Sequence, residues 1–329
     1  MGHLMDGQWI TDTEIAKTSG GAFQRPDAQF RNWITPDGRP GPSGDGGFPA
    51  VSGRYHLYVS LACPWAHRAL IFRKLKGLER HMSVDVVHPD MREMGWTFAS
   101  DMPGATGDSL FGLDYLHQIY QRADPRVSTR ATVPVLWDKE RGTIVSNESS
   151  EIIRMLNGAF DGITGNRDDY WPEAMRAAIE PVNARIYDTV NNGVYRCGFA
   201  RTQEAYETAV HELFETLDWL EERLSRNRYL MGEHVTEADW RLATTLFRFD
   251  AVYNIHFKVS RNRLVDFPNL WAYARELYQW PGIAATVDFD HIMRHYYTSH
   301  ESINPRRIIP MMPEADWTEP HGRVKRSAA

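Results

Sequence analysis

The chain has 329 residues, of which 42% are hydrophobic and 24% charged, as is typical of a globular protein large enough for two domains. Its net charge of −6 comes without a visible basic stripe, which argues against nucleic acid as a partner. No apolar stretch approaches the roughly 18 residues that cross a bilayer, and the polar N-terminal segment lacks the apolar core of a signal peptide. Two cysteines are too few for a disulfide framework. These features predict a cytoplasmic protein with no membrane partner.

Residues 1–53 are expected to form an extended N-terminal arm without regular structure. The stretch Thr35–Pro49 is dense in glycine and proline, which predicts a long loop. Aromatic residues give this arm anchors for packing against a folded body, namely Phe23, Phe30, Trp33 and Phe48.

The next segment predicts a β-α-β unit. Tyr55–Ser60 is rich in aromatic and β-branched residues, which favours a strand. A helix is expected over Pro64–Lys76, because Gly77 is a suitable residue to end it. Ser83–His88 is expected to be the second strand.

Further along, the pattern predicts a helix over Leu110–Gln121 and then a hairpin. The hairpin strands are Thr132–Trp137 and Thr143–Ser146, and a helix is expected to follow from about Ser149. The order β-α-β-α-β-β-α over residues 54–160 predicts an α/β domain.

From about residue 172 to residue 300 the pattern is that of an all-helical domain. Leu213–Leu224 has apolar residues at helical spacing. Thr236 and Asp239 have the spacing of a capping box at the start of another helix. Residues 301–329 are rich in proline, and this tail is expected to wrap over the surface.

Cys63 lies between the first strand and the helix that begins at Pro64. A thiol in the first turn of a helix faces unpaired backbone N–H groups and the positive end of the helix dipole, which stabilise a nucleophilic thiolate. A lone cysteine is otherwise most often a core residue, but the strand-Cys-Pro-helix context favours a reactive thiol. Because residue 66 is alanine, no Cys-x-x-Cys dithiol exists. A mixed disulfide at Cys63 therefore has to be resolved by an external thiol, and glutathione is the obvious candidate.

Two further motifs fit a glutathione site. A proline within a strand requires a sheet edge or a cis bond, so Thr132-Val133-Pro134 predicts an exposed Val133 backbone that pairs with an extended peptide. The segment Asn147–Ser150 lies at a helix start, where N–H groups bind a carboxylate and an adjacent acid binds an ammonium. The γ-glutamyl end of glutathione carries both groups. Simple N-capping is the alternative interpretation of this second segment.

The cysteine motif Cys63–Ala66, the proline motif Thr132–Leu136 and Asn147–Ser149 resemble the thioredoxin-like half of a cysteine-type glutathione transferase. Longer strings resemble one class of that superfamily, the Xi class or glutathionyl-hydroquinone reductases. These strings are Gly95–Phe98, Tyr187–Tyr195, Arg248–Asp250, Tyr253 and His256–Lys258. The resemblance covers nearly the whole chain.

This resemblance implies an N-terminal thioredoxin-like domain, a C-terminal helical domain, a homodimer and the reduction of glutathionyl-hydroquinones. Cys63 would be the nucleophile, and Cys197 would have no part in the mechanism. The resemblance also implies roles for the other site residues. Trp96 would contact glutathione, Arg130 would bind one of its negative groups, and Val133, Glu148 and Ser149 would bind its backbone and γ-glutamyl end. Tyr195 and Tyr296 would contact the hydroxyl groups of the hydroquinone. Without the resemblance, Trp96 and the two tyrosines would be interpreted as packing aromatics and Arg130 as a surface charge.

Two alternative functions stay open from the residues. An omega-like thioltransferase or dehydroascorbate reductase would use the same cysteine without an aromatic pocket. A non-catalytic binding module with the glutathione transferase fold would have no need of an acidic thiol. No Gly-rich phosphate loop and no His/Cys cluster at ligand spacing occurs in the sequence, so we expect neither a nucleotide nor a metal as cofactor.

Overall fold

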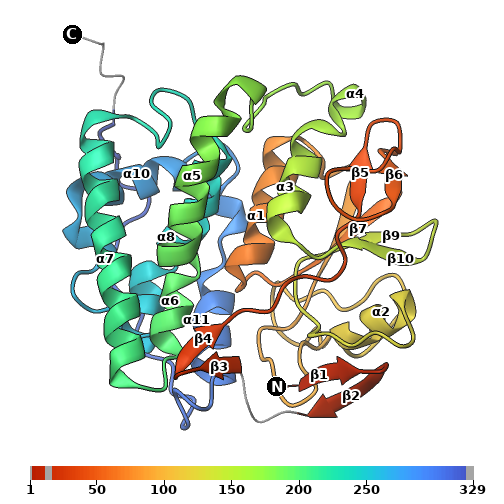
Figure 1. The fold of residues 1–329 in the computed structure, drawn as a ribbon, viewed down its shortest axis with the longest axis horizontal. Coiled ribbons are helices and arrows are strands. Elements are labelled where there is room, and N and C mark those ends of the chain that lie inside the picture. The colour runs from red at the N-terminus through yellow and green to blue at the C-terminus, as the bar shows by residue number, and fades with distance from the viewer. Residues whose placement is uncertain (1, 12–16, 324–329) are drawn as a thin grey trace.

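A computed structural model describes residues 2–11 and 17–323. The chain forms two halves that lie side by side, one built on a four-stranded mixed sheet and one made of helices (Figure 1). The predicted fold class, a thioredoxin-like domain joined to an all-helical domain, is confirmed.

The sheet has the strand order β10-β9-β7-β8. Strand β7 (Tyr55–Val59) pairs in parallel with β8 (Met82–Val86) and antiparallel with β9 (Val135–Asp138). Strand β10 (Thr143–Ser146) completes the predicted hairpin with β9. All five residues of β7 are buried, which fits its central place and its apolar sequence.

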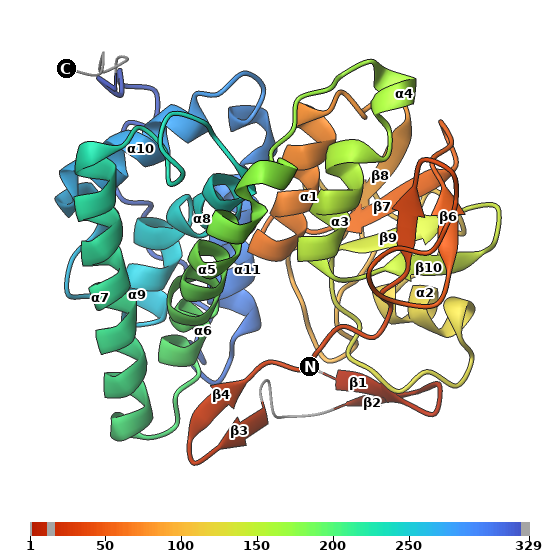
Figure 2. The ribbon, with the colours of Figure 1, turned by 45° about the horizontal axis from the view of Figure 1, so that its top comes forward.

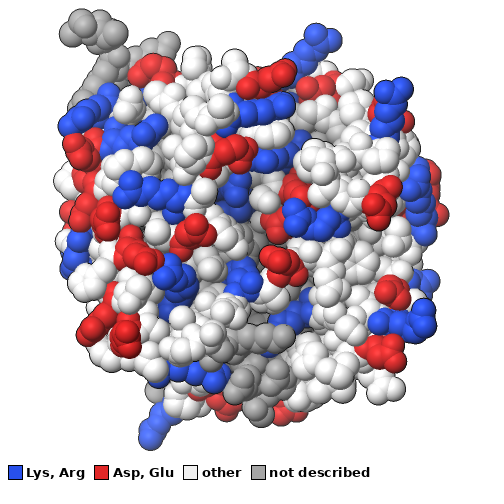
Figure 3. Space-filling model, in the orientation of Figure 1, with Lys and Arg blue, Asp and Glu red and all other residues white. Residues whose placement is uncertain are grey.

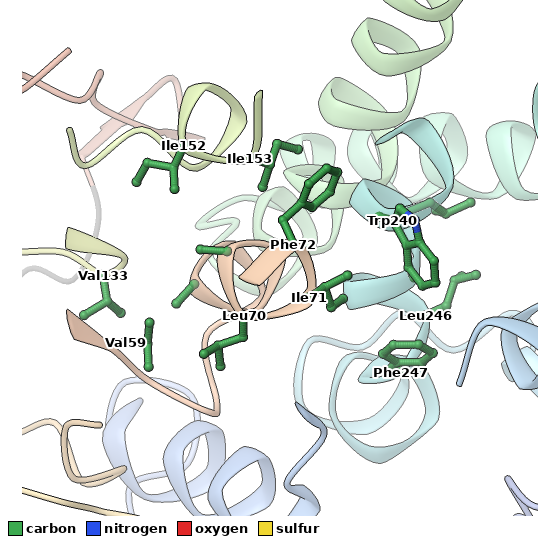
Figure 4. Close-up of a cluster of buried hydrophobic side chains, with 14 of the residues drawn as sticks. Val59, Leu70, Ile71, Phe72, Val133, Ile152, Ile153, Trp240, Leu246 and Phe247 are labelled. Atoms are coloured by element: carbon green, nitrogen blue, oxygen red, sulfur yellow. The ribbon is translucent and has the colours of Figure 1, made fainter. Parts of the chain in front are cut away.

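Helix α1 (Pro64–Leu75) connects the two halves. It packs against α3 (Ser149–Gly158) within the thioredoxin-like half and against α8 (Glu237–Leu246) of the helical half. Figure 4 shows its apolar side chains between the two other helices. The buried residues of this cluster include Leu70, Ile71 and Phe72 of α1, Ile152 and Ile153 of α3, and Trp240, Leu246 and Phe247 at α8. This contact fixes the position of the helical half relative to the start of α1.

The helical half follows a short connecting helix, α4 (Asp161–Thr164). Besides α8 it contains α5 (Arg176–Ile186), α6 (Gly193–Gly198), α7 (Gln203–Arg226), α9 (Asn254–His256), α10 (Pro268–Tyr278) and α11 (Phe289–Ser299). Two π-helical turns, Tyr187–Asn191 and Phe249–Tyr253, and three 3-10 turns, Glu173–Met175, Leu264–Asp266 and Ala284–Thr286, complete it. The predicted capping box of Thr236 and Asp239 is confirmed at the start of α8. In the tail, Trp317 packs against Trp271 of α10 with ring centroids 4.7 Å apart.

The N-terminal arm is more regular than expected, so the prediction of an irregular loop is wrong for part of it. Short strands form two hairpins and one parallel pair, namely β1 (Gly2–Met5) with β2 (Gln8–Thr11), β3 (Lys17–Ser19) with β4 (Ala22–Gln24), and β5 (Trp33–Thr35) with β6 (Gly47–Pro49). Positive φ angles at glycines allow the tight hairpin turns. Figure 2 shows the two hairpins extending beneath both halves.

The arm is attached to α3 by polar contacts. Arg31 forms an ion pair with Glu151, whose Oε1 also accepts a hydrogen bond from Ser43 at 2.7 Å. In addition, the backbone N–H of Phe30 donates to the side chain of Asn147 at 3.1 Å, next to the start of α3. These contacts hold the arm against the start of α3.

The predicted helix over Leu110–Gln121 begins later than expected, because α2 spans Leu116–Ala123. The residues before it form a turn in which Asp108 accepts the N–H groups of Leu110 and Leu113 at 3.1 and 3.0 Å. Side-chain acceptors of this kind compete with helical hydrogen bonds. The apolar spacing of this stretch therefore suggested more helix than the backbone forms.

On the face drawn in Figure 3, basic and acidic side chains are interspersed without a large field of one sign. Among residues 2–11 and 17–323, none of the helices combines the length and the apolar character needed to cross a bilayer.

Candidate active site

The structure brings the cysteine and proline motifs together. Cys63 is the N-cap residue of α1, and Pro64 occupies the first helical position as predicted. The Cys63 thiol donates a long hydrogen bond to the carbonyl oxygen of Val133, with 3.6 Å between sulfur and oxygen. The bond between Val133 and Pro134 is cis, one of the two geometries that the sequence pattern requires. Within the described ranges, the N–H of Val133 has no hydrogen-bond partner and is free for a ligand.

The pKa of Cys63 is higher than expected for the acidic thiol that the sequence predicts. Burial raises the pKa of this thiol above its usual range, whereas the backbone N–H groups of Ala66 and Trp65 and the charges of Arg248 and Arg25 lower it. The helix start therefore acts in the predicted direction, but the burial of the thiol outweighs it. The hydrogen bond from the thiol to the Val133 carbonyl oxygen also favours the neutral form of Cys63, because only the protonated sulfur can donate it.

Arg248 lies fully buried beneath the turn that carries Cys63. Its guanidinium donates to the carbonyl oxygens of Leu61 and Ala62 at 3.0 and 2.8 Å and to Nδ1 of His67 at 3.1 Å. Burial and the Arg248 charge lower the pKa of His67 well below its usual range, so this imidazole is neutral and accepts at Nδ1. Among the described residues, Arg248 has no carboxylate partner. Its charge is therefore available to the sulfur, and its hydrogen bonds fix the turn.

The predicted γ-glutamyl site lies at the start of α3. Glu148 is the N-cap residue, and its Oε1 accepts from the backbone N–H and the hydroxyl of Ser150 at 2.8 and 2.7 Å. Both capping bonds end on Oε1, so Oε2 is not used by the cap. Ser149 is buried at the first helical position. Arg130 is half-buried in the loop three residues before Val133. N-capping is thus present, and it leaves one carboxylate oxygen for an ammonium group.

The predicted tyrosines meet in a cluster of hydroxyl groups beside Cys63. Tyr195 of α6 and Tyr296 of α11 have their hydroxyl oxygens 2.6 Å apart. Tyr253, from the π-helical turn after α8, lies 3.0 Å from the Tyr296 hydroxyl. The ring of Trp65, two residues after Cys63, lies 6.4 Å from that of Tyr195 between centroids. Burial raises the pKa of each phenol, and a negative charge on Cys63 raises the pKa of Tyr195 and Tyr253 further. The three phenols are therefore neutral hydrogen-bond donors at ordinary pH.

Trp96 lies in the segment between β8 and α2 and is buried. Its ring stacks on His295 of α11, with centroids 4.6 Å apart and planes 23° apart. The imidazole of His295 is held in turn by the carbonyl oxygen of Pro89 at 2.8 Å. The predicted contact of Trp96 with glutathione stays a prediction.

Sequence reasoning missed three residues of this site. Tyr253 and Arg248 lie within strings that carried the family resemblance, but a tyrosine and an arginine on a helix give no local sign of a distant partner. Arg25 of the arm lies over the rings of Trp65 and Tyr195. Only the folded chain brings Arg25 to the site, which contains one accessible thiol and a cluster of neutral hydroxyl donors.

Each half of the chain matches a protein-family model. Residues 62–159 match the model described as the N-terminal domain of glutathione S-transferase, and residues 203–276 match the C-terminal domain. A mixed sheet with a cysteine at the start of α1, followed by a helical domain, defines a cysteine-type glutathione transferase.

Similar proteins show to which group of cysteine-type glutathione transferases the chain belongs. The chain is 58% identical to glutathionyl-hydroquinone reductase YqjG of Escherichia coli K12, over 98% of each chain, and its fold matches that protein's glutathione-bound structure with a TM-score of 0.91 over 98% of this chain and 99% of the other. It is 49% identical to glutathionyl-hydroquinone reductase PcpF of Sphingobium chlorophenolicum, over 95% and 96% of the two chains. A Xi-class transferase from Natrialba magadii matches at 46% identity and a TM-score of 0.89, over 98% and 96% of the two chains. The chain belongs to the glutathionyl-hydroquinone reductases, the Xi class of glutathione transferases.

Proposed function

We propose that this protein reduces glutathionyl-hydroquinones to hydroquinones with glutathione as the second substrate. The observation that carries the proposal is the cluster of Tyr195, Tyr253 and Tyr296 hydroxyls in the site that contains Cys63, the more exposed of the two cysteines. A thioltransferase that acts on small mixed disulfides has no use for donors that face an aromatic oxygen. The close relatives named glutathionyl-hydroquinone reductases support the same assignment.

The proposed reaction balances with two thiols as the reductant. The ring carbon that bears sulfur gains a proton as the hydroquinone takes its keto form. The Cys63 thiolate attacks the glutathionyl sulfur, the sulfur–carbon bond breaks, and its electron pair restores the aromatic ring as the oxygen takes a proton. A Cys63–glutathione disulfide remains. A second glutathione attacks its glutathionyl sulfur, which releases the Cys63 thiolate and oxidised glutathione.

The residues of the site have separate roles in this proposal. Glutathione lies along the Val133 backbone as an added strand. Its γ-glutamyl end is bound by Glu148, Ser149 and the N–H groups of the α3 start, while Arg130 and Trp96 hold the rest of the tripeptide. Tyr195 donates to an oxygen of the ring, while Tyr296 contacts the ring and supports the Tyr195 hydroxyl through their hydrogen bond.

The deciding experiment compares two substrates. Turnover of a glutathionyl-hydroquinone is measured beside turnover of a small glutathione mixed disulfide. We expect the conjugate to be reduced to the free hydroquinone, with one oxidised glutathione formed per product. Rapid reduction of the disulfide without any reduction of the conjugate would instead favour an omega-like thioltransferase. If neither reacts, the protein is a binding module.

Replacing Glu148 with glutamine is expected to weaken glutathione binding more than it slows the chemical steps. The amide oxygen of glutamine still accepts the Ser150 N–H, so the cap of α3 survives, while the charge that attracts the ammonium group is lost. A charge-assisted hydrogen bond of this kind contributes about 1.5–3 kcal/mol. The KM for glutathione should therefore rise about tenfold to a hundredfold, and steady-state kinetics measure it. An unchanged KM would leave Glu148 with its capping role alone.

Binding of glutathione should lower the pKa of Cys63. The thiol donates to the Val133 carbonyl, and a peptide that pairs with the Val133 backbone competes for that oxygen. The neutral thiol then loses its acceptor, and thiolate should form at lower pH. Ultraviolet titration of thiolate in a Cys197→Ser variant, with and without S-methylglutathione, measures the change. A curve that stays in place or moves to higher pH would argue against pairing at Val133.

We also propose, from the resemblance, that the chain forms a homodimer, which sedimentation analysis tests. Its two free cysteines favour the cytoplasm as its location. The proposed division is an arm of residues 1–53, a glutathione-binding domain of residues 54–160, a helical domain of residues 172–300 and a tail of residues 301–329. The last six residues of that tail lie outside the described part of the chain.

A further inference from the structure

Arg25 enters the active site from the N-terminal arm, directly after β4. The carbon at the centre of its guanidinium lies 4.7 Å from the ring centroid of Tyr195, 4.8 Å from that of Trp65 and 5.3 Å from that of Phe23. Trp65 is the second residue after Cys63, and Tyr195 carries one of the clustered hydroxyl groups. The positive charge of Arg25 therefore lies over a residue next to the Cys63 turn and over a residue of the tyrosine cluster.

The polar contacts of Arg25 are incomplete. Its Nε donates to Oδ1 of Asn192 at 2.9 Å, which fixes the orientation of the guanidinium. Its Nη2 is buried and has no hydrogen-bond partner among the residues that the structure describes. Within the same residues, no carboxylate forms an ion pair with Arg25. A buried N–H donor without an acceptor costs free energy, and an unfilled donor beside a reactive group points to a ligand that supplies the acceptor.

The position of Arg25 indicates which part of the ligand supplies the acceptor for Nη2. Asn192 and Tyr195 belong to the helical half, on the side of the phenol cluster, and Trp65 belongs to the first turn of α1 beside Cys63. The proposed tripeptide contacts lie elsewhere in the thioredoxin-like half, in the loop before Val133 and at the start of α3. Burial is the largest influence on the pKa of Cys63 and Tyr195, and the Arg25 charge lowers both pKa values. Because Arg25 lies over Trp65 and Tyr195, its charge is on the side of the site where the ring of the substrate would lie.

We propose that Arg25 is a substrate-binding residue whose Nη2 donates to an oxygen of the aromatic ring and favours the ionised form of that oxygen. This inference rests on the proposed function, because it takes the ring to be that of a glutathionyl-hydroquinone. The N-terminal arm is then part of the substrate site. A charged donor on a phenolate forms a stronger and shorter hydrogen bond than a neutral donor does.

The test measures binding without turnover. In a Cys63→Ser background, calorimetry gives the Kd of S-(2,5-dihydroxyphenyl)glutathione and of S-methylglutathione, which has the tripeptide but no ring. Arg25→Met keeps the length and the aromatic contacts of the side chain and removes its donors, and Arg25→Lys keeps the charge. Arg39→Met is the matched control, because Arg39 is an exposed residue of the same arm that pairs with Asp37.

We expect Arg25→Met to raise the Kd of the aryl conjugate at least about tenfold and to leave that of S-methylglutathione unchanged. Arg25→Lys should recover part of the loss, and Arg39→Met should bind both ligands normally. An equal loss for both ligands would place Arg25 on the tripeptide and overturn the inference, as would an unchanged Kd for the conjugate. If the protein with Arg25 intact binds S-methylglutathione but not the conjugate, the proposed function itself fails.

Discussion

Replacing Cys63 with alanine is expected to reduce glutathionyl-hydroquinone turnover to background while the protein stays folded. The proposed reaction passes through a disulfide on this sulfur, and the chain has only one other thiol. That thiol, Cys197 in α6, is 3% exposed, and burial raises its pKa to about 12. It is therefore neither accessible nor ionised at neutral pH and cannot replace Cys63.

Steady-state assays beside circular dichroism and thermal unfolding measure this effect. Cys197→Ser is the matched control, and we expect it to retain nearly all activity on the conjugate. Turnover of more than a few per cent in Cys63→Ala, in a folded protein, would refute a mechanism that uses a single thiol. A comparable loss in Cys197→Ser would mean that the second cysteine takes part.

The sequence predicted those parts of the fold that short-range patterns determine. Strand β7, helix α1 and the hairpin of β9 and β10 follow from residue types and from proline and glycine at their ends, and each lies within a few residues of its expected place. The same applies to Cys63 at the N-cap and to the capping box of α8. In each case the determining contacts lie within a few residues along the chain.

Contacts between distant segments could not be read from the residues. Tyr195, Tyr253 and Tyr296 come from three elements of the helical half, and only the packing of α6 and α11 around the π-helical turn brings their hydroxyls together. Arg25 reaches Trp65 across 40 positions of the sequence. Residues that act through such contacts look like ordinary packing or surface residues until the fold is known.

The pKa of Cys63 shows a second limit of local reasoning. A helix start lowers the pKa of a thiol, and the N–H groups of Trp65 and Ala66 do so here. The cost of burying a charge depends on the helical half and the arm that cover the sulfur, and a local pattern does not contain them. The two effects act in opposite directions, and the charges of Arg248 and Arg25 only partly offset the burial.

Loss of the Tyr195 hydroxyl should slow reduction of the glutathionyl-hydroquinone about 10²–10³-fold in kcat. Negative charge develops on a ring oxygen as the sulfur–carbon bond breaks, and a neutral phenol aimed at that oxygen stabilises it and can transfer a proton. Tyr195 is only partly buried, whereas Tyr253 and Tyr296 are fully buried, so we expect its hydroxyl to be the one that the ring reaches. If Tyr253 donates to Tyr296 and Tyr296 donates to Tyr195, the Tyr195 proton is free for the substrate.

This order of donors predicts a graded series of phenylalanine variants. Tyr296→Phe removes a supporting hydrogen bond, which contributes about 1 kcal/mol, so its kcat should fall roughly fivefold to tenfold, less than in Tyr195→Phe. Tyr297→Phe is the matched control on the same helix, because the Tyr297 hydroxyl bonds to the Ala251 carbonyl outside the cluster. Reduction of a simple glutathione mixed disulfide should stay nearly unchanged in all three variants, since that substrate has no ring oxygen. Equal losses on both substrates would reduce the tyrosines to a structural role, and a larger effect of Tyr296→Phe than of Tyr195→Phe would reverse the order of donors.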